Sequence, residues 1–145
     1  MKEVINNIWS WNGVFAHEII LTNEFGNIIF KSNNNDYWRI CPEELLIEKI
    51  ANHKSEFEIL INIQGFKEGW EMKNLVRVAE NKLGKLEEGE SYYFVIPPVI
   101  GGKYDESNIQ KIKSEELISL SGDLAFQIKY LKDGQKIRIK VKKND

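Results

Sequence analysis

The stretch YYFVIPPVIGGKYDES, residues 92–107, constrains the fold more than any other part of the sequence. It begins with aromatic and β-branched residues, which are typical of a strand. Pro97 and Pro98 end that strand, because proline has no backbone N–H to donate to a neighbouring strand. Gly101 and Gly102 then supply the backbone dihedrals that a sharp turn requires. The sequence therefore predicts a strand that stops abruptly and leads into a stiff, tightly turned loop.

A meander of three short strands is predicted earlier in the chain, in the segment HEIILTNEFGNIIFKSNNNDYWRI, residues 17–40. Two β-rich runs there flank a turn at Gly26, and a polar asparagine-rich stretch separates the third run. The segment KIRIKVK, residues 136–142, is the clearest strand pattern, because apolar and basic residues alternate along it.

Two short helices are predicted after the meander. The first begins at Pro42 in CPEELLIEKIAN, because proline suits the first helical position. Glu43 and Glu44 follow at the positive end of the helix dipole, which favours acidic residues. Ser55 and Glu58 fit a capping box, which predicts the start of the second helix.

Two longer helices are predicted in the second half of the chain. From Trp70 to Leu83 the apolar residues recur at helical spacing, and Gly84 suits the C-terminal end. Ser114 is the predicted cap of a last helix, whose apolar spacing continues through Gly122. The end of this helix has an alternative interpretation as a strand, because alternation is also present at Phe126, Ile128 and Tyr130. The longer periodic run favours the helix.

These elements predict an α+β fold with a mostly antiparallel sheet and about four helices, in a single domain over residues 1–145. The formal net charge is −2, so no overall field attracts nucleic acid or an anionic membrane. The apolar runs are far shorter than the roughly 20 residues that cross a bilayer, and the N-terminus lacks the pattern of a signal peptide. Since Cys41 is the only cysteine, no internal disulfide can form. We expect a cytoplasmic protein.

The sequence brings no catalytic or metal-binding groups together. His17 and His53 are the only histidines and lie in different predicted elements, so we expect no metal site. Cys41 precedes a predicted helix start, but Glu43 and Glu44 oppose a thiolate there, which favours a buried structural cysteine. Nucleotide-binding and hydrolase motifs are absent from the sequence. We therefore expect neither catalytic residues nor a cofactor.

Two loops and one pair of tryptophans are candidates for contact with a protein partner. The first loop is acidic and consists of Glu87, Glu88 and Glu90. The second is the stiff loop after the prolines, which presents Lys103, Tyr104, Asp105 and Glu106. A stiff loop loses little entropy on binding, but the same loop also suits a crossover that only fixes the fold. Trp9 and Trp11 would point the same way from a strand, where a core role is favoured over an exposed contact.

The motifs NEFGNIIF, DYWRICPEEL, IPPVIGGKY and GDLAFQIKYLKDG occur in an order that resembles a bacterial domain family. This family is the C-terminal domain of type VI secretion immunity proteins that neutralise a DNase effector. The resemblance spans about Trp11 to Val141. It implies a cytoplasmic antitoxin that binds a toxin and blocks its active site or substrate access, without catalysis.

The leading hypothesis is therefore an immunity-type protein that occludes a partner toxin, with a nuclease as the proposed partner. A nuclease site is generally basic, so the acidic loop would occupy it as a phosphate mimic, and we expect salt-sensitive association. One alternative is a small-molecule-binding or hydrolase-like domain with a pocket under the Gly-Gly loop, using Tyr104, Asp105 or Glu106. Another is a subunit of a homo-oligomer with the N-terminal tryptophans at the contact.

Overall fold

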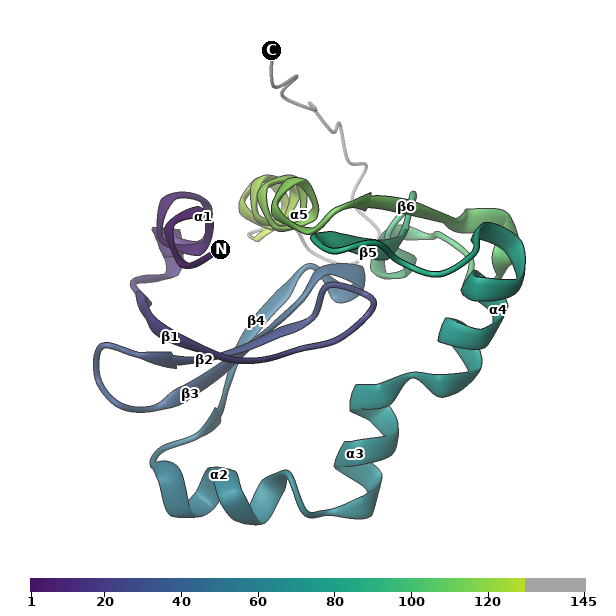
Figure 1. The fold of residues 1–145 in the computed structure, drawn as a ribbon. Coiled ribbons are helices and arrows are strands. Elements are labelled where there is room, and N and C mark those ends of the chain that lie inside the picture. The colour runs from purple at the N-terminus through teal and green to yellow at the C-terminus, as the bar shows by residue number, and fades with distance from the viewer. Residues whose placement is uncertain (130–145) are drawn as a thin grey trace.

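The computed structural model describes residues 1–129, and Figure 1 shows how their elements are arranged. A four-stranded antiparallel sheet in the order β1-β2-β3-β4 lies in the middle, formed by β1 (Ala16–Thr22), β2 (Ile28–Ser32), β3 (Tyr37–Cys41) and β4 (Leu46–Ala51). One side of this sheet is covered by α1 (Lys2–Ile8), α5 (Ser114–Ile128) and the antiparallel pair β5 (Glu90–Phe94) and β6 (Ile109–Lys113). The other helices are α2 (Lys54–Leu60), α3 (Gln64–Glu71) and α4 (Lys73–Leu83). The predicted α+β fold with mostly antiparallel strands is confirmed.

The two faces of the sheet bury different apolar clusters. Successive residues of a strand point to opposite faces, so Ile28 and Phe30 contact the layer of α1 and α5, whereas Ile29 contacts the layer of α2. In the second layer the ring of Phe57 stacks on that of Tyr37 with centroids 4.4 Å apart. Figure 1 shows α2 and α3 on this side, away from α1 and α5.

A third apolar cluster joins α4 to the β5–β6 pair. Its fully buried members are Phe25, Ala79, Tyr92, Phe94 and Ile109. The apolar stripe of α4 packs on them through Met72, Leu75, Val76 and Leu83. The helical spacing in the sequence therefore predicted which face of this helix is buried.

The predicted three-stranded meander is confirmed. β1, β2 and β3 pair in sequence order, and the turn between the first two contains Gly26 with φ 71°. Glycine suits the positive φ of this turn, and a Cβ there would lie 2.4 Å from Leu117 Cδ2, so the leucine side chain of α5 would have to shift.

The predicted helix at Pro42 is wrong. Only the 3-10 helix η2 (Pro42–Glu44) is helical, and the chain then enters β4, which pairs with β3 through Cys41 with Leu46 and Ile40 with Ile47. Leu45 ends η2 in the left-handed region with φ 50°. Pairing with the free edge of β3 satisfies the backbone of this segment, and this tertiary interaction overrides the helical spacing of its apolar residues.

The predicted helix from Trp70 is also wrong at its start. Trp70 belongs to α3, which the sequence did not predict, and the chain breaks at Met72 with φ 49° before α4 begins. The side chain of Asn23 donates from Nδ2 to the carbonyl oxygen of Trp70 at 2.8 Å, so a distant loop supplies a partner at this break. The predicted end is confirmed, because Gly84 follows α4 and its N–H bonds the carbonyl of Glu80 at 2.8 Å.

The remaining helix starts differ slightly from the predicted caps. α2 begins after His53, and Glu56 instead of Glu58 reaches back to accept from the N–H of Asn52 at 2.8 Å. Ser114 is the first residue of α5, and its hydroxyl bonds that of Ser91 at 2.6 Å.

α5 continues without interruption through Gly122 to Ile128, which confirms the helix over the strand as far as that residue. Tyr130, Leu131 and the predicted strand at residues 136–142 lie outside the described residues. The helix α1 and the strand β6 are two further elements that the sequence did not predict.

The N-terminal tryptophans follow a helix and do not lie in a strand. Trp9 caps α1 and is 0% exposed, and its Nε1 donates to the carbonyl of Ile118 at 3.0 Å. Trp11 lies in the 3-10 helix η1 (Ser10–Asn12) and stacks on Trp9 with ring centroids 6.0 Å apart. The core role favoured from the sequence is confirmed for Trp9.

Candidate partner-binding surface

The segment of residues 95–106, here called the contact loop, exposes a group of large apolar side chains. About half of each side chain is accessible, with 48% for Val95, 54% for Ile96, 53% for Val99 and 54% for Tyr104. Most apolar residues exposed on a protein are scattered singly, whereas these four lie within one short segment. The contact loop is therefore a candidate site for binding another protein.

The side chain of Asn108 holds the contact loop in place. Its Oδ1 accepts from the N–H of Ile96 at 2.9 Å, and its Nδ2 donates to the carbonyls of Ile96 at 2.8 Å and Lys103 at 3.0 Å. Asn108 is itself 8% exposed. One buried amide thus joins both ends of the contact loop, so the exposed apolar residues are presented on a preformed backbone.

The glycines allow the tight path of this loop. A Cβ on Gly102 would lie 1.7 Å from the carbonyl oxygen of Ile96, which no side chain can tolerate. Gly101 has φ 107° at the end of the 3-10 helix η3 (Pro98–Ile100). The turn predicted from the two glycines is confirmed, and Pro97 is buried beneath it.

The charged residues predicted here border the apolar group. Lys103, Asp105 and Glu106 are all exposed, and Asp105 precedes the 3-10 helix η4 (Glu106–Asn108). Hydrogen bonds from Ser107 to the carboxylate lower the pKa of Asp105, so it is anionic at neutral pH. The carbonyl of Glu106 accepts from the ammonium group of Lys82 in α4.

Tyr104 contacts the body of the protein through its aromatic ring. This ring meets Phe94 in an edge-on arrangement with centroids 5.1 Å apart. Burial raises the pKa of Tyr104, and the charges of Glu43 and Glu44 raise it further. The phenol is therefore neutral at physiological pH and lies beside two acidic residues of η2.

The acidic loop lies apart from the contact loop. Glu87 and Glu88 are exposed, but Glu90 is half-buried and its Oε1 accepts from the N–H of Glu87 at 2.8 Å, which closes the turn. Glu90 is the first residue of β5 and pairs with Lys113, whereas the contact loop follows the last residue, Phe94. The structure therefore places the two predicted contact loops at opposite ends of the β5–β6 pair.

A small cavity separates η2 from the start of the contact loop. Pro42 and Glu43 line one part of it, and Val95 and Pro97 line another. The volume is about 20 Å³, which is room for a single water, whereas small-molecule sites typically enclose about 300 Å³ or more. This cavity does not accommodate the ligand that the small-molecule alternative requires.

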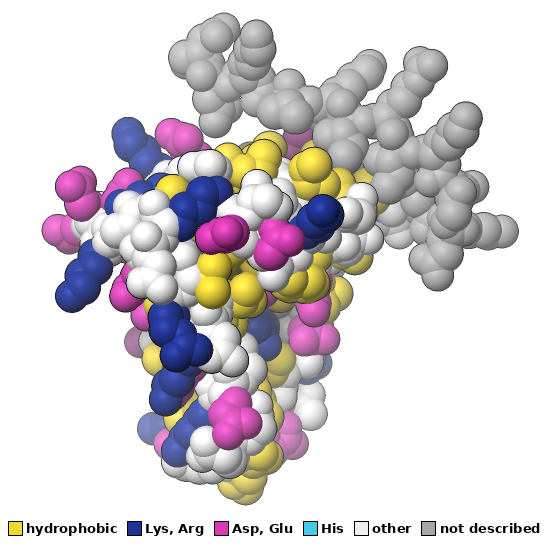
Figure 2. Space-filling view, turned by 90° about the vertical axis from the view of Figure 1, so that its right-hand side faces the viewer, with side chains coloured by type: hydrophobic (Ala, Val, Ile, Leu, Met, Phe, Trp, Pro, Cys, Tyr) yellow, Lys and Arg dark blue, Asp and Glu magenta, His cyan; other side chains and the backbone are white. Residues whose placement is uncertain are grey.

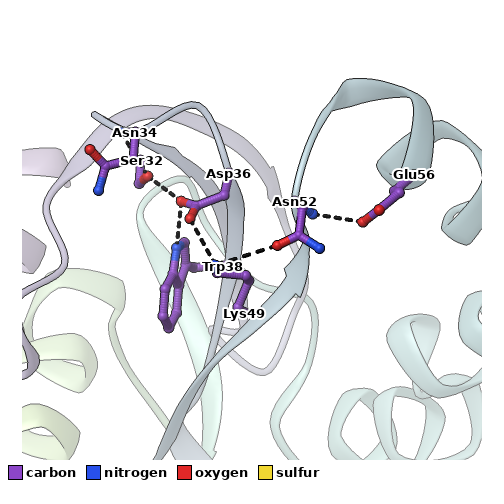
Figure 3. Close-up of polar contacts among 7 residues, drawn as sticks. All are labelled: Ser32, Asn34, Asp36, Trp38, Lys49, Asn52 and Glu56. Atoms are coloured by element: carbon purple, nitrogen blue, oxygen red, sulfur yellow. Dashed lines mark hydrogen bonds and ion pairs between the residues drawn. The ribbon is translucent and has the colours of Figure 1, made fainter.

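Figure 3 shows a polar cluster at the β2–β3 turn, outside the predicted sites. The Asp36 carboxylate accepts from the hydroxyl of Ser32 and from Trp38 Nε1, the latter at 2.7 Å. It also pairs with Lys49 Nζ at 3.3 Å, and Lys49 contacts Asn52 Oδ1 at 3.4 Å. Burial opposes ionisation, but these hydrogen bonds outweigh it and lower the pKa of Asp36. A carboxylate with so many partners is a structural anchor and a poor general base.

Replacing Asp36 with Asn should therefore give a pH-dependent loss of stability. At pH 7 we expect a loss of about 1–3 kcal/mol, because charge-assisted hydrogen bonds are lost. Since the folded-state pKa is lowered, this contribution is present above the unfolded pKa of about 3.9 and is lost as pH falls through the folded value. Urea unfolding of both proteins between pH 7 and pH 2 measures the difference, which should shrink at the acid end. Asn34→Ala in the same turn is the control, and a pH-independent loss in Asp36→Asn would contradict this role.

The described residues also bear on two kinds of chemistry, metal binding and the reactivity of a thiol. Within residues 1–129, no group of His, Cys, Asp and Glu is arranged to hold a metal ion. Cys41 is 4% exposed, and burial and then the charge of Glu43 raise its pKa, so the thiol is neutral. No helix within these residues is long and apolar enough to cross a membrane.

The face formed by α3 and α4 carries both signs of charge (Figure 2). The exposed residues of these helices include the cations Lys73, Arg77 and Lys82 and the anions Glu71 and Glu80. Figure 2 shows dark blue and magenta side chains interspersed, with hydrophobic ones between them. This face therefore has no uniform potential to attract a highly charged partner.

The sequence did not predict Val95, Ile96 and Val99 as surface residues. Their composition is typical of a buried strand, and Val95-Ile96 continues directly from β5. The signal in the sequence is the adjacent Pro97-Pro98 pair, which cannot take part in strand pairing, and β5 ends before it at Phe94.

Residues 51–125 match the model of a protein family described as T6SS immunity protein Tdi1, C-terminal. The match covers more than half of the 145 residues, and it contains the whole contact loop. The fold is thus that of a type VI secretion immunity domain. This chain belongs to the family of the C-terminal domain of T6SS immunity protein Tdi1. The predicted resemblance is confirmed, although two of its motifs precede residue 51.

A solved structure shares the fold. The crystal structure of Atu4351 from Agrobacterium tumefaciens superposes with a TM-score of 0.55 at 17% sequence identity, covering 83% of this chain and 62% of that one. This chain therefore spans less than two thirds of that protein, and at this identity the likeness concerns the fold alone. None of the curated proteins compared with the chain matches it.

Proposed function

We propose that this chain binds a type VI secretion effector in the cytoplasm and neutralises it by covering its active site or the path of its substrate, without catalysis. Membership of the immunity family supports an effector as the partner. The observation that carries the proposal for this chain is the contact loop, with four exposed apolar side chains on a preformed backbone inside the family-matched region.

The composition of the contact loop fits the anatomy of a protein interface. Interfaces have an apolar centre with aromatic anchors, surrounded by a polar rim. Tyr104 supplies the aromatic anchor, while Lys103, Asp105 and Glu106 are exposed beside it. The hydrogen bonds of Asn108 fix the loop before binding, so little conformational entropy is lost in the complex.

We propose a nuclease as the effector because acidic groups border both candidate loops. Glu44, Asp105 and Glu106 are exposed close to Tyr104, and Glu87 and Glu88 are exposed at the far end of β5. A nuclease binds phosphate with a basic surface, and an acidic surface is complementary to it. The contact loop would supply affinity and the acidic loop would steer association.

Co-expression in a bacterial host tests the function directly. Each protein encoded beside this chain's gene is expressed alone and together with the chain, and surviving cells are counted. We expect one such protein to be lethal alone, to degrade DNA, and to be harmless when the chain binds it. Protection without a complex between the two purified proteins would contradict occlusion.

Two sets of variants separate the anchor from the steering charges. Tyr104→Ala should weaken the complex by about 2 kcal/mol, or about 30-fold in Kd, mainly through faster dissociation. Replacing Glu87 and Glu88 with Lys should slow association about tenfold at low salt and change dissociation little. Stopped-flow and surface plasmon resonance measure both rates.

Ile59→Ala is the matched control for these variants, because Ile59 is an apolar residue of α2 that is 67% exposed and lies outside both loops. It should leave both rates unchanged. Equal losses in Tyr104→Ala and Ile59→Ala would remove the contact loop from the interface.

A further inference from the structure

A chain of polar side chains links η2 to α3, and Asn27 and Glu43 within it are buried. Asn27 is 0% exposed, and its Nδ2 donates to both carboxylate oxygens of Glu43, at 2.9 and 3.2 Å. Its Oδ1 accepts from Arg39 at 2.8 and 3.2 Å. The guanidinium of Arg39 in turn lies 5.3 Å from the ring centroid of Trp70 in α3. Arg39 and Glu43 are therefore joined through one neutral amide.

The two charges determine how the amide is oriented. A guanidinium offers only donors and a carboxylate offers only acceptors, so Asn27 must turn its oxygen to Arg39 and its nitrogen to Glu43. The backbone of Asn27 is also fixed, because its N–H donates to Asn23 Oδ1 at 3.0 Å. Glu43 is only 8% exposed, and a buried carboxylate is costly unless hydrogen bonds and a countercharge compensate for it. Arg39 supplies that countercharge through Asn27.

Glu43 lies in the turn that supports the contact loop. η2 packs against η3 and β5, and Pro42 and Glu43 face Val95 and Pro97 across the small cavity. η2 ends at Leu45, a non-glycine residue in the left-handed region, which persists only where the surroundings hold it. Glu43 therefore lies in direct packing contact with the elements that form the start of the loop that carries Tyr104.

We propose that Arg39 is a positioning residue for the contact loop, acting through Asn27 and Glu43 to hold η2 beneath it. Arg39 lies in β3, outside the family-matched residues, and is not part of the contact loop. The importance of the loop in binding rests on the proposed function, but the positioning itself is a property of the free protein.

The test uses the full chain labelled with 3-fluorotyrosine, with the Tyr104 fluorine resonance assigned from Tyr104→Phe. Arg39→Met removes the countercharge and should move the Tyr104 resonance by more than its line width. Arg39→Lys keeps the charge and should give a smaller shift. Lys31→Met, which removes a cation from the neighbouring strand β2, is the matched control and should leave the resonance in place.

A second background shows whether Arg39 acts through Glu43. In Glu43→Gln the buried carboxylate is absent, so adding Arg39→Met should move the Tyr104 resonance far less than it does in the native chain. Glu44, the exposed neighbour of Glu43, provides the control. Glu44→Gln should not reduce the shift of the Tyr104 resonance that Arg39→Met causes. An unmoved resonance in Arg39→Met, or equal shifts with and without Glu43, would overturn the proposal.

The proposed function is tested separately with the effector identified by co-expression. Arg39→Met should weaken that complex several-fold, while Lys31→Met should not. If the fluorine resonance shifts as expected but no effector binds the native chain, the positioning role stands and the proposed function fails. If an effector binds and Arg39→Met shifts neither the resonance nor the affinity, the function stands and the positioning role fails.

Discussion

Gly102→Ala is expected to disrupt the contact loop and abolish effector binding. The added methyl group would lie 1.7 Å from the carbonyl oxygen of Ile96 and 2.8 Å from Asn108 Nδ2. Both atoms belong to the hydrogen bond that closes the loop, so relief of the overlap requires that this bond break. We expect a loss of about 2–4 kcal/mol in the free energy of unfolding. Urea denaturation measures this loss, and titration with the effector measures binding.

Gly69→Ala is the matched control, because it makes the same chemical change where space is available. Gly69 lies in α3, and a Cβ there would meet no atom within 4 Å. Alanine is a better helix former than glycine, so the free energy of unfolding of this variant should rise by up to about 1 kcal/mol. The variant should bind the effector normally. The rigid-loop interpretation fails if Gly102→Ala keeps native stability and affinity.

Features that depend on local backbone chemistry could be predicted from the sequence. The meander turn at Gly26 and the end of α4 at Gly84 follow from the sequence, and β5 stops before the prolines, although at Phe94 and not directly before Pro97. Each follows from a property of a single residue type, either access to positive φ or the missing N–H of proline. Such signals do not depend on tertiary contacts with the rest of the chain.

Features that depend on distant residues could not be predicted. β4 was predicted to be helical, because its partner β3 is not visible in the local spacing of apolar residues. The break at Met72 involves Asn23, 47 residues before Trp70, whose carbonyl it binds. In both cases a tertiary hydrogen bond overrides the helical pattern.

The candidate surface was predicted only in part. The glycines identified a shaped loop, and Tyr104 is exposed on it, as a binding role requires. The apolar part was missed, because Val95 and Ile96 have the composition of a strand core and are exposed only where Asn108 redirects the chain. The two predicted loops lie at opposite ends of the β5–β6 pair, which separates Glu87 and Glu88 from the contact loop.

Trp9→Ala is expected to destabilise the protein strongly. Trp9 is 0% exposed, is the largest fully buried side chain, and donates to the carbonyl of Ile118 in α5. Its removal leaves a large cavity between α1 and α5 and deletes the hydrogen bond to Ile118, so we expect a loss of about 3–5 kcal/mol. Since domains of this size are stable by about 5–15 kcal/mol, a large fraction of the variant would unfold under mild denaturation. Circular dichroism during urea unfolding measures the change.

Gly122 allows this prediction to be tested without relying on one destabilised variant. A Cβ on Gly122 would lie 2.7 Å from Trp9 Nε1 and 2.5 Å from Ile8 Cγ2, so Gly122→Ala should destabilise the native chain. When Trp9 is already alanine, much of that overlap disappears, and the helical preference of alanine offsets the remainder. The loss caused by Gly122→Ala should therefore shrink in the Trp9→Ala background, because contacting residues are not additive. Strict additivity would show that the α1–α5 contact is looser than the structure indicates.

Trp9→Ala should also leave the molecular mass in solution unchanged, because a fully buried indole cannot form the contact between subunits that the homo-oligomer hypothesis requires.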